Sequence, residues 1–119
     1  MSSRRTELRL RDIIEDARRI ETFIDGMSLT EFRANERTLF AVERLLQRIT
    51  EAAIHIPASE AQTIGFRVAT AELRAFGNRL RHEYRDIDPS IVLDIARIEV
   101  PALRAEAENA LDTLLGRPE

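Results

Sequence analysis

The chain has 119 residues, of which 44% are hydrophobic and 33% are charged, and its formal net charge is −3 at pH 7. This size suits one domain over residues 1–119, with enough apolar residues for a core. We expect no membrane span, because no apolar run reaches about 18 residues. We expect no secretory signal, because Arg4 and Arg5 have no apolar run behind them. The absence of cysteine excludes disulfides and thiolate metal sites and fits a cytoplasmic protein. The negative net charge excludes wholesale wrapping of nucleic acid, so any phosphate-binding site must be a local patch.

Apolar residues in the first half of the chain repeat at intervals of three and four, which predicts amphipathic helices. The first helix is expected over about residues 6–25, with an apolar stripe of Leu10, Ile13, Ile14, Ala17, Ile20 and Ile24. Gly26 is placed to end it, because glycine adopts the left-handed conformation freely. Ser28 and Glu31 have the spacing of a capping box. They predict the start of a second, long helix that extends to about residue 54.

The second helix has an expected break near Asn35, and Pro57 ends it. Ser59 with Gln62 can open a third helix. We expect this helix to extend to about residue 85, loosened at Gly65, because an interior glycine costs roughly 1 kcal/mol relative to alanine.

The last helix is predicted from Asp88 to about residue 115. Asp88 is a strong N-cap, and Pro89 occupies the first helical position, where its missing N–H is harmless. Pro101 falls inside this helix, where a lost backbone bond and a ring clash usually produce a kink. No alternating strand pattern occurs in the sequence. The sequence therefore predicts an all-α, up-and-down antiparallel bundle of four to five helices with a kinked last helix.

Polar residues of the third helix gather on one face. At about 100° per residue, Leu73, Phe76 and Leu80 share one side. The opposite side is a basic stripe that contains one imidazole and consists of Arg74, Asn78, Arg81, His82 and Arg85.

This grouping has a chemical interpretation as an RNA-cleaving site. Metal-free cleavage of RNA needs a base for the 2′-OH proton, an acid for the leaving oxygen and cations for the phosphate. Histidine suits either proton role near neutral pH, and arginine binds phosphate oxygens through its planar fork. We assign catalysis to His82, Asn78 and Arg81, and phosphate binding to Arg74, Arg79 and Arg85.

The alternative explanation is a solvated arginine-rich surface with a structural histidine. His55 lies near a helix end, where a capping role is expected rather than catalysis. Two histidines without cysteine make a zinc site improbable, and the four glycines are too dispersed for a phosphate loop. No cofactor and no metal are predicted.

The chain resembles a HepT-like protein of the HEPN superfamily, the toxin component of MNT/HepT toxin–antitoxin pairs. The resemblance covers nearly the whole chain and rests on Arg9-Leu10-Arg11-Asp12-Ile13-Ile14, on Thr38, Ala41, Val42, Arg44 and Leu45 leading to Glu51-Ala52, on Asn78-Arg79-Leu80-Arg81-His82-Glu83-Tyr84, on Ile87-Asp88-Pro89 and on Pro101-Ala102-Leu103.

The resemblance implies a homodimer that cleaves RNA in a cleft between its two subunits, with an arginine and a histidine of one motif acting together. It also implies a partner nucleotidyltransferase of the MNT type, which silences the toxin by adenylylating the motif tyrosine, here Tyr84. Asn78, His82 and Tyr84 match the motif, but Gly77 stands where the arginine is expected.

That departure leaves two hypotheses. In the first, another arginine substitutes, and the helical projection favours Arg81 or Arg74 over Arg79, because those two share the face of His82. In the second, the chain is a non-catalytic helical module that binds a nucleotidyltransferase.

Overall fold

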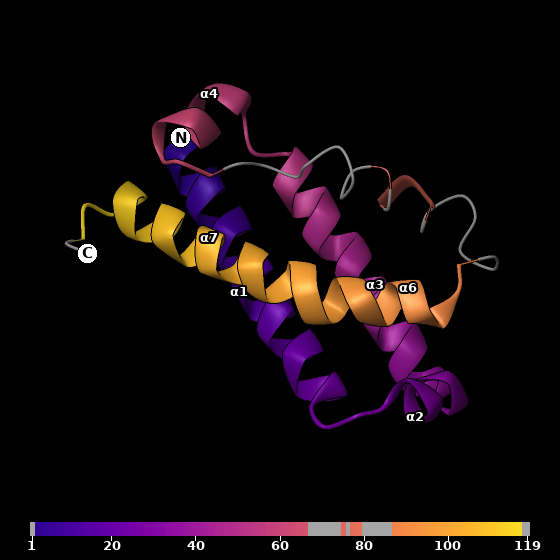
Figure 1. Cartoon of the computed structure of the whole chain (residues 1–119). Helices are drawn as coiled ribbons and strands as arrows, with labels where there is room; N and C mark the ends of the chain where they lie inside the picture. Colours follow the sequence, from indigo (N-terminus) through magenta and orange to yellow (C-terminus); the bar gives the residue numbers. More distant parts are fainter. Residues whose placement is uncertain (1, 67–74, 76, 80–86, 118–119) are drawn as a thin grey trace.

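The computed structural model describes residues 2–66, 75, 77–79 and 87–117, and every element assigned within these ranges is a helix (Figure 1). The elements are α1 (Ser2–Ile24), α2 (Leu29–Ala34), α3 (Glu36–Ile54), α4 (Ala58–Thr63), α6 (Pro89–Asp94), the π-helical turn η2 (Ile95–Glu99) and α7 (Val100–Leu114). The prediction of an all-α bundle is confirmed. Within the described part of the chain, no helix is long and apolar enough to cross a membrane.

Helix α1 lies at the centre of the packing, between α3 and α7. The predicted apolar stripe of α1 is fully buried, with Leu10, Ile13, Ala17 and Ile20 all 0% exposed. Each large aliphatic side chain removed from water in this way contributes about 1.5–3 kcal/mol. The stripe therefore provides much of the energy that holds the three long helices together.

The predicted signals between α1 and α3 are also confirmed. Gly26 has a positive φ of 70°, and the capping box has both of its bonds, each 3.1 Å long, between Ser28 and Glu31. Asn35 separates α2 from α3, and its Oδ1 accepts the backbone N–H of Thr38 at 3.0 Å. The expected break near Asn35 is thus a capped helix start.

The prediction of one helix from Ser59 to residue 85 is wrong at its beginning. Helix α4 starts at Ala58 without a side-chain cap, so Ser59 is a helical residue and not the N-cap. The helix ends after Thr63, because Gly65 takes a φ of 73° and the N–H of Phe66 donates to Ala61 O at 2.8 Å. Gly65 is therefore a helix terminator of the kind made by left-handed glycine, and not a loosened interior residue.

The last helix begins as predicted. Asp88 Oδ1 accepts the N–H of Ser90 at 2.8 Å, and Pro89 stands at the first turn. Just before Pro101, where the sequence predicts a kink, the structure has the π-helical turn η2, in which the N–H of Val100 bonds to Ile95 O. Widening the helix by one residue accommodates a ring that has no N–H to donate.

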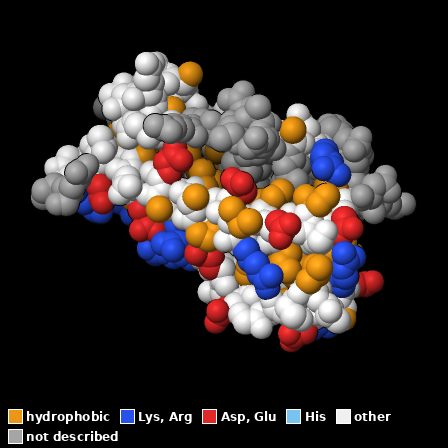
Figure 2. All heavy atoms as spheres, in the orientation of Figure 1, with side chains coloured by type: hydrophobic (Ala, Val, Ile, Leu, Met, Phe, Trp, Pro, Cys, Tyr) orange, Lys and Arg blue, Asp and Glu red, His pale blue; other side chains and the backbone are white. Residues whose placement is uncertain are grey.

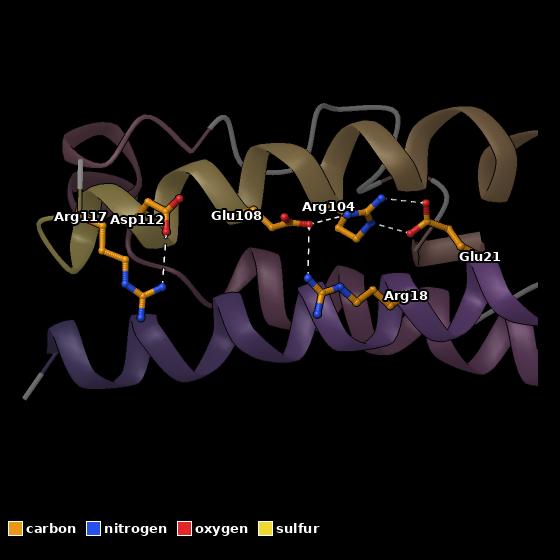
Figure 3. A network of polar contacts seen from close by, with 6 residues as sticks. All are labelled: Arg18, Glu21, Arg104, Glu108, Asp112 and Arg117. Atoms are coloured by element: carbon orange, nitrogen blue, oxygen red, sulfur yellow. Dashed lines mark hydrogen bonds and ion pairs between the residues drawn. The ribbon is translucent and has the colours of Figure 1, made fainter. Parts of the chain in front are cut away.

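A polar clamp joins α7 to α1 (Figure 3). Arg104 on α7 donates to both carboxylate oxygens of Glu21 on α1, with its Nε at 2.6 Å and its Nη2 at 3.2 Å, and also to Glu108 at 2.5 Å. The hydrogen bonds to Glu21, followed by those to Glu108, raise the pKa of Arg104 above its usual value. Arg18 approaches Glu108 at 3.9 Å.

Replacing Arg104 by methionine should lower the free energy of unfolding by about 1 kcal/mol, because a two-point Arg–carboxylate pair joins two helices while remaining partly solvated. Arg18→Met is the matched control, since its ion pair with Glu108 is long and its side chain is 65% exposed. Urea denaturation measures the free energy of unfolding of both variants and of the wild type. Equal losses would show that the geometry of the clamp carries no special stability.

Candidate functional site

The structure describes two of the residues assigned to the site from the sequence. Asn78 and Arg79 are helical and exposed. The remaining predicted residues of this segment, on both of its faces, lie outside the described residues: Leu73, Arg74, Phe76, Leu80, Arg81, His82, Tyr84 and Arg85. The convergence of His82 with its neighbouring arginines thus stays a prediction.

Gly77 anchors this segment on α3. It is buried, and a Cβ atom added to it would lie 2.3 Å from Thr50 Cγ2 and 3.0 Å from Thr50 Cβ. Thr50 is itself 2% exposed, and its Oγ1 donates to Leu46 O at 2.8 Å. The backbone at residue 77 therefore touches the side chain of Thr50, an approach that only glycine permits.

The buried position of Gly77 directs its neighbours toward solvent. At about 100° per residue, Asn78 lies a quarter turn away from Gly77, and Arg79 points nearly opposite to it. Among the described residues no carboxylate lies within ion-pair distance of Arg79.

A groove of about 700 Å³ lies between α1 and α7, but its charged residues do not suit a phosphate site. Its four guanidinium groups are all held in ion pairs: Arg11 with Glu7, Arg18 with Glu108, Arg19 with Glu15 and Asp16, and Arg117 with Asp112. A phosphate entering this groove would have to displace carboxylates that are already in place.

His55 lies in a smaller hollow of about 220 Å³ between α1 and α3. Its Nδ1 is 2.6 Å from Glu51 O, and His55 is the C-cap residue of α3. Nearby Arg48 is held by the buried Asp16, with 3.0 Å between Nε and Oδ2. The capping role expected for His55 is confirmed.

In the described ranges, no group of three or more histidine, aspartate or glutamate side chains is arranged to hold a metal ion. The polar side chains in the described part of the site are those of Asn78 and Arg79, and both residues are exposed.

The chain leaves the site segment at Asp88, which is fixed by two interactions. Its carboxylate accepts the backbone N–H of Ser90 and pairs with Arg33 of α2 at 3.0 Å between Oδ1 and Nη2. The bond from Ser90, and to a lesser extent the charge of Arg33, lower the pKa of Asp88. Both interactions fix the start of α6 against α2.

We expect Asp88→Asn to keep the cap, since asparagine is an equally good N-cap, while losing the ionised carboxylate. Because the pKa of Asp88 is lowered on folding, its charge stabilises the fold above its usual pKa of 3.8. This stabilisation is lost as the pH falls through the lowered value. Unfolding measured between pH 7 and pH 2 should show a wild-type advantage that shrinks at the acid end. A constant difference would contradict this account.

Comparison with known proteins shows the family of the chain. The family model described as "Ribonuclease HepT-like" matches residues 13–110. "Putative RNase MJ1216" of Methanocaldococcus jannaschii is 30% identical over 110 residues, covering 92% of this chain and 90% of that protein. "Probable ribonuclease HepT" of Thermococcus cleftensis is 27% identical over 100 residues, covering 84% of this chain and 90% of that protein. No solved structure matches the chain significantly. The chain belongs to the HepT-like ribonuclease family.

Proposed function

We propose that the chain is a metal-independent endoribonuclease and the toxin of a HepT/MNT-type toxin–antitoxin pair. His82 acts as general acid or base, Asn78 and Arg81 assist it, and the phosphate is bound by Arg74, Arg79 and Arg85. The observation that carries the proposal is membership of a ribonuclease family over residues 13–110. The exposure of Asn78 and Arg79 next to a buried Gly77 supports it.

The proposal includes a homodimer. One helical stripe alone makes a shallow site, whereas two copies facing each other make a groove. Hydrophobic side chains gather on the face of the molecule formed by α6, η2 and α7 (Figure 2). On this stretch Ile91 is 38% exposed and Ile98 is 67% exposed. Apolar surface of this kind supports association with another protein surface.

The proposed partner is an MNT-type nucleotidyltransferase that adenylylates Tyr84 in the cytoplasm. The added phosphate would oppose the phosphates of RNA by like-charge repulsion. This regulation rests on the match of Asn78, His82 and Tyr84 to the family motif.

A second function, that of a non-catalytic binding module for the nucleotidyltransferase, is favoured by Gly77. The close contact with Thr50 leaves no room for an arginine at that position. A module of this kind would form the same complex without arresting growth when expressed alone.

The His82→Ala variant should lose RNA cleavage by about 10²- to 10⁴-fold, the usual contribution of a positioned general acid or base. Cleavage by the wild type should persist in EDTA. His55→Ala is the matched control, because this histidine caps α3 and should leave cleavage nearly unchanged. Cleavage of a mixed RNA pool by purified, unmodified protein is the measurement.

Wild-type protein that leaves the whole RNA pool intact, while still binding a co-expressed nucleotidyltransferase, would favour the binding module instead. Cleavage that survives in His82→Ala would contradict the role of that residue even if the chain is a ribonuclease.

A further inference from the structure

The contact between Thr50 and Gly77 packs the segment against α3, and it also affects which charges the site can hold. The structure assigns Thr50 as the residue that keeps position 77 without a side chain. By excluding a cation from that position, Thr50 limits the cleavage rate. This inference rests on the proposed ribonuclease function and adds a residue of α3 that determines the charge composition of its site.

The geometry explains why Thr50 cannot simply move aside. Rotation about its Cα–Cβ bond could relieve the 2.3 Å approach of Cγ2, but the 3.0 Å approach of Thr50 Cβ does not depend on the rotamer. The rotamer is also held by the bond from Oγ1 to Leu46 O. With Thr50 2% exposed and Ala53 0% exposed on the same helix, there is little free space around it.

The residues next to Gly77 cannot supply the positive charge that is missing at position 77. Residue 77 is the point of the segment closest to α3, while residues 78 and 79 face outward. A guanidinium on a stem from residue 77 would emerge between α3 and the exposed Asn78. Arg79 points away from α3 and cannot place its charge there.

Stability provides a test that needs no RNA. Alanine normally stabilises a helix relative to glycine, but Gly77→Ala should lower the melting temperature by about 4 °C or more, since it overpacks the contact. The penalty should be smaller in a Thr50→Ala background, which removes Cγ2 and Oγ1 but keeps Cβ. In a Thr50→Gly background, Gly77→Ala should raise the melting temperature. A graded reversal of sign is expected only if residue 50 occupies the space.

RNA cleavage then tests the functional half of the inference, that the missing cation at residue 77 limits the rate. The steric half is that Thr50 excludes a side chain there. In the Thr50→Gly background, Gly77→Arg should raise kcat/KM on RNA about tenfold or more over Gly77→Gln, whose side chain is polar but carries no charge. The steric half is overturned if Gly77→Ala has the same effect on melting in all three backgrounds. Equal cleavage by the arginine and glutamine variants overturns the functional half. Failure of the proposed function is detected separately, by wild-type protein that leaves the whole RNA pool intact.

Discussion

The direct contact between the backbone at Gly77 and the side chain of Thr50 is the constraint on which the candidate site depends. Two helical segments that meet through a glycine approach each other more closely than segments with side chains between them. The contact gives the segment a definite buried side. With Gly77 against α3, Asn78 and Arg79 face solvent. The same contact leaves the expected arginine position without a side chain.

The rest of the fold supplies a rigid support for this contact. Helix α1 is packed between α3 and α7, and charged residues join helices at the edges of the core: Arg104 with Glu21, Arg48 with Asp16, and Arg33 with Asp88. Arg18, on α1, also reaches Glu108 of α7. These arginines of the described helices are therefore used in holding the fold together.

Local signals made much of the fold predictable from the sequence. The spacing of Leu10, Ile13, Ala17 and Ile20 predicted the buried stripe, and Ser28 and Asp88 marked helix starts because their side chains bond to backbone N–H groups nearby. At Asn35 the sequence predicted only a break, which the structure shows to be a third capped start. Gly65 was misjudged, because a glycine that ends a helix and one that interrupts it look alike until φ is known.

The contact between Thr50 and Gly77 could not be predicted, because 27 positions of sequence separate two residues that carry no local signal of their meeting. A threonine in an apolar stripe and a glycine in a helical pattern each have ordinary explanations. Only the packing of α3 against the later segment brings them together. His55, by contrast, was assigned its cap correctly from its position at a helix end.

The most direct test of the central claim is a solution NMR measurement of nuclear Overhauser effects from the Thr50 methyl group. The account predicts a strong cross-peak between this methyl and an α-proton of Gly77, because a Cβ in place of that proton would lie 2.3 Å from the methyl carbon. A Thr50 methyl that shows cross-peaks within α3 and none to Gly77 would contradict the account.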